Sequence, residues 1–374
     1  MMKVRLSRDE VTEALTSIQQ VVPPKTTLPI LSNLLMKAEG GRLYITATDL
    51  DISISTSLEA DVLEDGATTV PARKFAEIVR EFPQEVFQLD ESEDRITLTC
   101  GKGQYKLTGM DWEEFPKIQN AIDGVKVSID GGIVRRIVGS TSFAVSSDET
   151  RPALGGVLWK MEGKDTKLVS TDGHRLALIE LTSVLKGDED LSVEVIVPSK
   201  ALNQINRLIG EGKQLEGITF GEKYLQADLQ GAVVITRLVE GPYPNYELVM
   251  PKDNDKLVVV DRDVLEAAVR RVAILSNTQT HQVRFDIEEN SAMLSAVSPD
   301  LGAEAREQVE VSYDGAPLSL AYNAHYFLEV LRHLPKGELE LSLKTPVSAC
   351  LVRPVDQAEG EILTFLLMPL RLND

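Results

Sequence analysis

The sequence predicts an α+β protein made of three similar domains, in which helices cover one face of antiparallel sheets. Three observations predict this class: landmarks at a nearly constant spacing, two amphipathic helix patterns in every third of the chain, and short alternating strand patterns between them. One landmark is an aspartate between apolar runs, at Asp49, Asp172 and Asp300, and these positions lie 123 and 128 residues apart. The expected domains span residues 1–124, 125–253 and 254–374.

Each third is expected to begin with a short strand followed by a helix. Ser7 and Glu10 form a capping-box pattern at the start of the first helix. Asp130 and Asp261 stand at the corresponding helix starts of the second and third thirds. The expected apolar stripes are Val11, Leu15, Ile18 and Val22; Val134, Val138, Thr141 and Val145; and Val264, Ala268, Val272 and Leu275.

A second helix is expected midway through each third, and a proline turn closes each third. Pro71 and Pro198 precede two of these helices, where proline is tolerated because the first turn leaves its N–H groups unpaired. The closing turns are Phe115-Pro116, Tyr243-Pro244 and Met368-Pro369. The six expected helices span residues 7–22, 72–82, 131–145, 199–211, 261–277 and 322–334.

Residues 170–177 combine turn chemistry with reactive side chains. The stretch Ser-Thr-Asp-Gly-His-Arg-Leu-Ala lies between apolar runs and predicts two strands joined by a tight turn. This turn would place His174 and Arg175 side by side at the edge of a sheet. His174 beside Asp172 permits a general base, but no nucleophile is evident nearby, so a histidine that packs and hydrogen-bonds in the turn is favoured.

The charge balance bears on nucleic acid as a partner. Acidic residues outnumber basic ones by 58 to 39, which gives a net charge of -19 and repels phosphate overall. The six expected helices, however, carry slightly more basic than acidic residues, whereas the remainder of the chain is strongly acidic. Surface helices often carry lysine and arginine, so two explanations stay open: ordinary decoration, or a helical surface that tolerates phosphate.

Several functional classes lack support in the sequence. There is no P-loop, no G-x-S-x-G stretch and no metal-ligand spacing, so no cofactor and no metal are expected. Two cysteines, Cys100 and Cys350, are too few for a disulfide framework. No apolar signal region and no run of about 18 apolar residues is present, so a cytoplasmic protein without membrane partners is expected.

Five stretches resemble the bacterial DNA polymerase III β subunits, the sliding clamps. They are Thr-Leu-Pro-Ile-Leu-Ser-Asn-Leu-Leu (27–35), Thr-Thr-Val-Pro-Ala-Arg-Lys-Phe (68–75), Thr-Asp-Gly-His-Arg-Leu-Ala (171–177), Ala-Ile-Leu-Ser-Asn (273–277) and Met-Pro-Leu-Arg-Leu (368–372). The resemblance runs from residue 1 to residue 374 and keeps the order of the motifs.

The resemblance implies a head-to-tail homodimer of six domains, closed into a ring with helices inside and strands outside. Such a ring encircles duplex DNA without sequence specificity, tethers the replicative DNA polymerase for processivity, and has neither catalytic activity nor a cofactor. Its implied partners are double-stranded DNA, a second copy of the chain, the DNA polymerase III catalytic subunit, an ATP-driven clamp loader, other polymerases, mismatch-repair proteins and ligase. The protein partners would bind through short linear clamp-binding motifs.

The resemblance also implies three sets of site residues. A peptide pocket between the second and third domains would consist of Leu154, Thr171, Gly173, His174, Arg175, Leu176, Pro244, Val249, Leu366, Met368, Pro369, Leu370, Arg371 and Leu372. DNA contacts would fall on Lys25, Arg73, Lys74, Arg80, Arg151, Lys200 and Arg207. The subunit interface would pair Tyr105 and Leu107 with Ile274 and Leu275.

This chain departs from its relatives at several of these places. Pro152 and Ala153 stand where some members carry aromatic residues, and the tail continues past the usual end by Asn373 and Asp374. Two other functional classes stay open beside the clamp: an enzyme that uses His174 and Asp172, and a peptide-binding scaffold that does not hold DNA.

Overall fold

The computed structural model describes residues 1–119, 121–182, 192–299 and 302–372. The chain divides into two compact units, which we call unit 1 (Met1–Gly131 with Asn203–Leu238) and unit 2 (Gly132–Leu202 with Val239–Asp374). Among the described residues, antiparallel sheets and six α-helices confirm the predicted α+β class. The division passes through the expected second domain, and the three domain boundaries remain a prediction.

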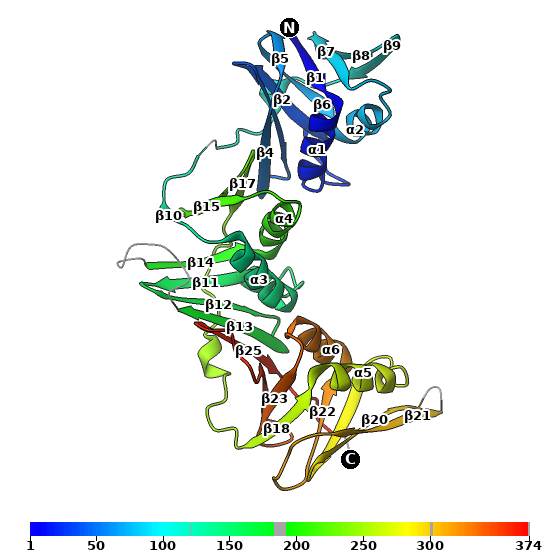
Figure 1. Ribbon diagram of the computed structural model, residues 1–374, viewed down its shortest axis with the longest axis vertical. Coiled ribbons are helices and arrows are strands. Elements are labelled where there is room, and N and C mark those ends of the chain that lie inside the picture. Colours follow the sequence, from blue (N-terminus) through cyan, green and yellow to red (C-terminus); the bar gives the residue numbers. More distant parts are fainter. Residues whose placement is uncertain (120, 183–191, 300–301, 373–374) are drawn as a thin grey trace. The chain divides into compact units, whose positions relative to one another are not determined.

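Unit 1 contains two antiparallel sheets (Figure 1). The five-stranded sheet has the order β5 (Asp61–Glu64), β1 (Met2–Ser7), β7 (Val86–Ser92), β8 (Arg95–Cys100) and β9 (Gly103–Thr108). The eight-stranded sheet has the order β10 (Val125–Val127), β15 (Leu215–Phe220), β16 (Tyr224–Leu229), β17 (Ala232–Arg237), β4 (Ile52–Glu59), β3 (Arg42–Thr48), β2 (Asn33–Glu39) and β6 (Gly66–Pro71). Pairing of β17 with β4 therefore joins strands from the first and second thirds of the chain in one sheet.

Unit 2 also contains an eight-stranded sheet that combines strands from two thirds of the chain, here the second and the third. Its eight-stranded sheet has the order β14 (Ser192–Pro198), β11 (Gly156–Glu162), β12 (Asp165–Thr171), β13 (Arg175–Thr182), β25 (Glu361–Leu367), β24 (Cys350–Pro354), β23 (Glu338–Leu343) and β18 (Lys256–Asp261). The four-stranded sheet has the order β21 (Ala303–Glu310), β20 (Ser291–Ser298), β19 (Gln282–Glu288) and β22 (Leu318–Asn323). The antiparallel β13–β25 pairing joins the two thirds.

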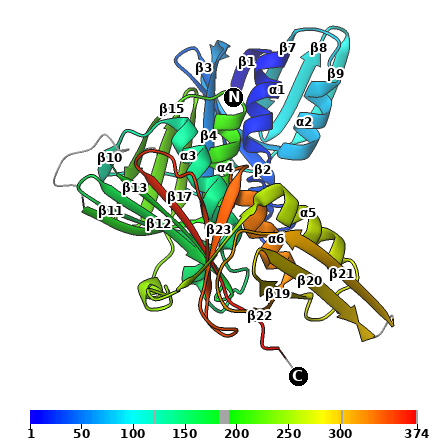
Figure 2. The ribbon, with the colours of Figure 1, turned by 60° about the horizontal axis from the view of Figure 1, so that its bottom comes forward.

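All six expected helices form, and each ends earlier than the sequence pattern predicted. They are α1 (Arg8–Ile18), α2 (Ala72–Arg80), α3 (Gly131–Thr141), α4 (Ser199–Gly210), α5 (Arg262–Ala273) and α6 (Ala324–His333). Figure 2 shows α1 beside α2, and α5 beside α6. Val22 and Leu334 are buried although each lies beyond a helix end, because the turns that follow the helices continue the apolar contacts. The spacing of apolar residues in the sequence indicates which side chains are buried, and buried side chains also occur in the turns beyond the helix ends.

Side-chain caps explain where several helices begin. The Ser7 hydroxyl accepts a hydrogen bond from the Glu10 N–H, as the capping pattern predicted. Asp261 caps α5 by accepting from the Val264 N–H at 2.9 Å. Asn323 caps α6 by accepting from the His325 N–H at 2.9 Å.

The expected apolar stripe of α5 was wrong at its first position. Val264 is 51% exposed, whereas Leu265, Ala268, Val269 and Val272 are buried. These four positions follow the i, i+3, i+4, i+7 spacing of one helix face, and Val264 lies off that face. Val264 was included in the predicted stripe because it is apolar and lies four residues before Ala268. Leu265, three residues before Ala268, fits the same helical spacing and is the residue that is buried.

In the part of the chain that the structure describes, no helix combines the length and the apolar character needed to cross a membrane. Cys100 and Cys350 are both buried free thiols, and burial raises the pKa of Cys350 to about 12.

Replacing Leu265 by alanine is expected to lower the free energy of unfolding by about 2–4 kcal/mol, because it leaves a cavity on a buried helix face. The matched change Val264→Ala is expected to cost less than about 0.5 kcal/mol, since that side chain is largely in water. Urea denaturation followed by circular dichroism measures both variants. Similar losses for the two would show that the buried face of α5 is assigned incorrectly.

Candidate functional site

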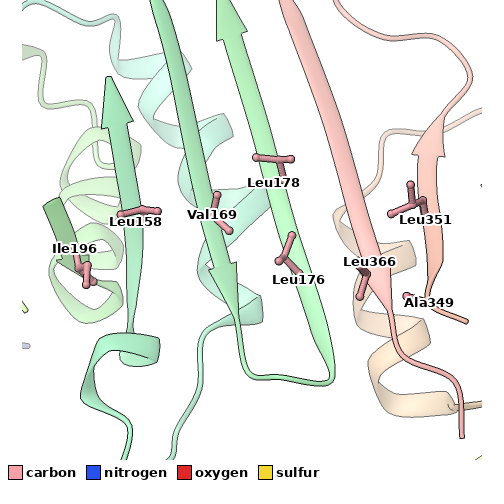
Figure 3. Packing of buried hydrophobic residues seen from close by; sticks show 8 residues of the cluster. All are labelled: Leu158, Val169, Leu176, Leu178, Ile196, Ala349, Leu351 and Leu366. Atoms are coloured by element: carbon pink, nitrogen blue, oxygen red, sulfur yellow. The ribbon is translucent and has the colours of Figure 1, made fainter. Parts of the chain in front are cut away.

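One face of the large sheet in unit 2 carries a continuous apolar cluster (Figure 3). Its members are buried and come from neighbouring strands: Ile196, Leu158, Val169, Leu176, Leu178, Leu366, Leu351 and Ala349. The register aligns them in two cross-strand rows. One row runs Ile196, Leu158, Val169, Leu178, and the other runs Leu176, Leu366, Leu351. Directly opposed apolar side chains on one face of a sheet stabilise it and form one surface.

Residues 239–250, which follow the second segment of unit 1 along the chain, pack on this cluster. Their apolar side chains that contact it are only partly buried. Val239, Tyr243, Tyr246 and Met250 contact the cluster while partly buried, as does Ala153 from the 3-10 helix Pro152–Gly155 before β11. Burial raises the pKa of the Tyr243 phenol well above its usual range, so this side chain stays neutral under ordinary conditions.

Three large apolar side chains near this cluster remain in contact with solvent. Leu248 is 82% exposed, Val249 is 52% exposed, and Met368, directly after β25, is 42% exposed. Exposed apolar groups beside a buried apolar floor are typical of a surface that receives apolar side chains of a partner. We call this surface, made of the cluster, residues 239–250 and Met368, the apolar face of unit 2.

The turn between β12 and β13 is fixed by hydrogen bonds to its own backbone. Asp172 Oδ1 accepts from the N–H groups of His174 at 2.8 Å and Arg175 at 3.0 Å. The Thr171 hydroxyl donates to the Arg175 carbonyl at 2.6 Å and accepts from the Gly173 N–H at 3.1 Å. Gly173 has a φ of +93°, which residues with a Cβ rarely adopt. The turn is therefore a preformed rim beside the apolar face.

The recurring aspartate of the sequence is thus a turn residue. Asp49 Oδ1 accepts from the N–H groups of Asp51 and Ile52 between β3 and β4, as Asp172 does between β12 and β13. Asp300 lies outside the described residues. Asp172 contacts the backbone of His174 rather than its ring, and the His174 ring stacks on Tyr326 at 5.6 Å between centroids. This arrangement does not support the general-base hypothesis.

The expected place of the turn at a sheet edge was wrong. β13 lies between β12 and β25, so His174 and Arg175 stand at the end of interior strands. The Met368 N–H donates to the His174 carbonyl at 2.9 Å, which ties the chain after β25 to the turn. The Leu370 N–H donates to the Ala321 carbonyl at 2.8 Å and continues this attachment.

Arg175 supports the turn from the side opposite the apolar face. It is 7% exposed, and side chains alternate along β13, so Arg175 and Leu176 point to opposite faces. Its guanidinium donates to Asp172 at 3.2 Å, to the Phe143 carbonyl at 2.9 Å and to Glu329 on α6. It also lies over the Tyr326 ring at 4.8 Å. The direct peptide contact proposed for Arg175 stays a prediction, and the structure gives its side chain a supporting position.

The other predicted pocket residues lie around the apolar face with different exposure. Leu154, Leu176 and Leu366 are buried, and Gly173, His174, Pro244, Val249, Met368 and Arg371 are exposed. Thr171, Pro369, Leu370 and Leu372 are half-buried. Asn373 and Asp374 lie outside the described residues.

Sequence reasoning missed several residues of the apolar face: Leu158, Val169, Leu178, Ile196, Leu351, Tyr243, Tyr246 and Met250. Alternation along the expected strand could have found Leu178, which stands two residues after Leu176. The remaining ones depend on strand register, which the sequence does not show.

The predicted DNA contacts are exposed with one exception. Lys25, Arg73, Lys74, Arg80, Arg151 and Lys200 are exposed, and Arg73, Lys74 and Arg80 all lie on α2. Arg207 is half-buried and donates to the Thr16 carbonyl at 3.1 Å and to the Ser17 carbonyl. It therefore caps the carboxyl-terminal end of α1, where a cation is stabilised by the helix dipole. Its role in DNA binding remains a prediction that this geometry does not favour.

The predicted interface residues lie on an edge strand and directly after a helix, and they differ in exposure. Tyr105 and Leu107 lie two residues apart on β9, which is an edge strand of its sheet. Tyr105 is 40% exposed, and Ile274, directly after α5, is 73% exposed. Leu275 is half-buried.

Replacing Arg175 by methionine is expected to cost about 3 kcal/mol of stability, because Asp172 and Glu329 lose a shared, desolvated partner. Hydrogen exchange at the amides of His174 and Met368 should accelerate as the turn loosens. The control Lys167→Met breaks an exposed pair with Glu180 on the same sheet and should cost less than about 1 kcal/mol. Unchanged exchange at both amides in the Arg175 variant would refute the supporting role.

Three family models match consecutive parts of the chain. They describe the N-terminal, central and C-terminal domains of the DNA polymerase III beta subunit, and they match residues 2–119, 128–245 and 247–371. The beta sliding clamp of Pseudomonas aeruginosa is 32% identical over 373 residues, which cover 99% of this chain and 100% of the relative. The beta sliding clamp of Caulobacter vibrioides is 32% identical over 379 residues and has the same coverage.

Solved structures share the fold. A crystal structure of a Pseudomonas aeruginosa sliding clamp bound to griselimycin is 31% identical, covers 99% of this chain and 100% of its own, and has a TM-score of 0.92. The DNA polymerase sliding clamp of Bacillus subtilis is 25% identical, covers 100% of both chains and has a TM-score of 0.94. These matches confirm the resemblance seen in the motifs, and the chain belongs to the DNA polymerase III beta subunit family, the beta sliding clamps.

Proposed function

We propose that two copies of this chain form a head-to-tail ring that encircles duplex DNA and tethers the replicative polymerase to it. As a sliding clamp, the protein is a non-catalytic processivity subunit of DNA polymerase III. The observation that carries the proposal beyond the family is the apolar face of unit 2 beside a preformed turn. The proposed place of action is the cytoplasm.

The apolar face of unit 2 is the proposed docking site for short linear peptides. Its floor accepts apolar anchor side chains, and the exposed His174 and Met368 stand at its rim. The proposed peptide donors are the DNA polymerase III catalytic subunit, the clamp loader, other polymerases, mismatch-repair proteins and ligase. Because they would share one site, these partners would exclude one another.

The charge distribution supports retention by topology rather than by affinity. A net charge of -19 disfavours tight binding of phosphate. The exposed cations of α2, together with Lys25, Arg151 and Lys200, are proposed to contact the DNA backbone without reading its sequence. Weak contacts of this kind allow sliding, whereas strong ones would hold the ring in place.

Two edge strands support a head-to-tail assembly. β9 ends the five-stranded sheet of unit 1, and β21 ends the four-stranded sheet of unit 2. Edge strands offer unpaired N–H and C=O groups to another chain. An interface between different surfaces of two copies, with Tyr105 and Leu107 facing Ile274 and Leu275, closes into a ring when the rotation between copies permits it.

Loading on circular DNA tests the proposed function. Labelled protein is loaded onto nicked circular DNA with a clamp loader and ATP, the circle is then linearised, and bound protein is followed by gel filtration. Retention before cutting and loss after cutting are expected. Retention after cutting would mean direct affinity for DNA, and a protein that never binds circles while remaining dimeric would favour the scaffold without DNA.

Replacing Val249 by aspartate is expected to weaken peptide binding at least tenfold, because a charge enters the apolar face. The control Val297→Asp places the same charge on β20 at a similarly exposed valine, 57% against 52% exposed, and should leave affinity unchanged. Fluorescence anisotropy with a labelled clamp-binding peptide of the polymerase catalytic subunit measures both. Equal affinities for the two variants would place the peptide elsewhere.

A further inference from the structure

Four charged side chains meet between α5 and α6 in unit 2. Glu266 is 7% exposed, and its carboxylate contacts three guanidinium groups. Arg262 lies at 3.0 Å from Oε2, while Arg270 and, at 3.8 Å, Arg332 both approach Oε1. One buried carboxylate thus contacts three arginines from two helices. The cluster of these four side chains therefore has an excess of positive charge.

Arg262 differs from the other two arginines. Its side chain is only 14% exposed, it also contacts the Asp263 carboxylate at 2.6 Å, and it donates to the Leu334 carbonyl at 3.3 Å. Those contacts join the start of α5 to the end of α6. Arg262 is therefore part of the packing between the helices, and Asp263 balances much of its charge.

Arg270 and Arg332 carry the charge that remains. Their side chains are 60% and 54% exposed. Within the described residues, Glu266 is the one carboxylate within 4.0 Å of either group. Arg270 turns Nη2 toward it and Arg332 turns Nε toward it. Since a guanidinium has five N–H donors, most donors of both groups are left for another anion.

The neighbouring Arg271 shows the opposite arrangement. Its side chain is also 60% exposed, but it forms a two-pronged contact with Glu307 through Nε at 3.0 Å and Nη2. The hydrogen bond from Arg271 lowers the pKa of Glu307, so this pair is mutually satisfied. Two adjacent arginines of equal exposure thus differ in how many of their donors a carboxylate engages: two nitrogens of Arg271, but only Nη2 of Arg270.

We propose that Arg270 and Arg332 form a binding site for backbone phosphate of duplex DNA, with Glu266 as the residue that positions them. The inference rests on the proposed function, because encircled duplex is the phosphate-rich partner. Guanidinium groups suit phosphate oxygens in charge and geometry, and such contacts carry no sequence information. None of the DNA contacts implied by the motifs lies beyond residue 253, so this site would give the last third of the chain a part in holding DNA.

Glu266 is expected both to order the two arginine side chains and to weaken their attraction for phosphate. It holds both guanidinium groups near one oxygen, which reduces the entropy cost of binding phosphate. It also cancels part of their charge, and the remaining attraction is modest. A sliding ring needs this combination, because each phosphate contact must break as the DNA moves past.

The test compares two double variants of the full-length chain that remove the same number of charges. Arg270→Gln with Arg332→Gln removes the proposed site, while Arg271→Gln with Arg284→Gln removes arginines that have their own carboxylates, Glu307 and Asp286. Binding to a fluorescent duplex is measured over a range of KCl concentrations. Melting curves and the dimer mass establish that each variant is folded.

For the variant Arg270→Gln with Arg332→Gln, the slope of log affinity against log salt concentration is expected to decrease in magnitude by about 1 to 2. Each phosphate that the protein no longer neutralises reduces the magnitude of this slope by about 0.9. The Arg271 and Arg284 variant should keep the wild-type slope. A further variant, Arg270→Lys with Arg332→Lys, should also keep it because both charges remain.

A wild-type slope in the Arg270 and Arg332 variant would overturn the inference, as would equal changes in both glutamine variants. Absence of measurable duplex binding by the wild-type protein would also contradict it. Retention on circles and release after cutting would still support the clamp in each of those cases, so the two ideas fail separately.

Discussion

The β13–β25 ladder is the interaction on which the candidate peptide site depends. It pairs residues 175–181 with residues 361–367, two segments from different thirds of the chain. This pairing sets Leu176 opposite Leu366, and the next ladder sets Leu366 opposite Leu351. Neither third alone contains the row. A slip of one residue in this ladder would turn Leu366 to the other face of the sheet and dismantle the apolar face.

Two arginines with little contact with solvent fix helices in place, one in each unit. Arg175 joins the β12–β13 turn to α6 through Asp172 and Glu329, and Arg207 joins α4 to the last carbonyls of α1. Each has several acceptors, as a planar group with five donors requires when water is excluded. The β12–β13 turn at the rim of the candidate peptide site is thereby coupled to α6, although no side chain of that helix belongs to the apolar face.

The sequence was informative wherever structure is set by neighbours along the chain. The existence of the six helices, the caps at Ser7 and Asp261, and the turn at Asp172 all depend on local chemistry, and all appear in the structure. The family resemblance located Leu176, Leu366 and Met368, which lie at one surface.

What the sequence did not show depends on contacts between distant segments. The two eight-stranded sheets each combine strands of different thirds, so the compact units do not follow the repeats. Val264 matched a helix stripe but faces solvent, because periodicity alone does not tell which of two adjacent apolar residues faces the core. Arg175 was predicted to contact a peptide and Arg207 to contact DNA, because the sequence does not show their backbone acceptors Phe143 and Thr16, which lie about 30 and 190 residues away.

The edge strands β9 and β21, two of the sheet edges in the part of the chain that the structure describes, affect how the protein behaves outside a ring. In a closed ring each edge would be occupied by the other copy, so closure would also act as protection against aggregation. An opened ring would present two complementary adhesive ends, and ends of this kind can add further copies in an unclosed chain. Any factor that opens the ring would therefore need to shield an edge or close the ring again quickly, and self-association of opened copies would increase with protein concentration.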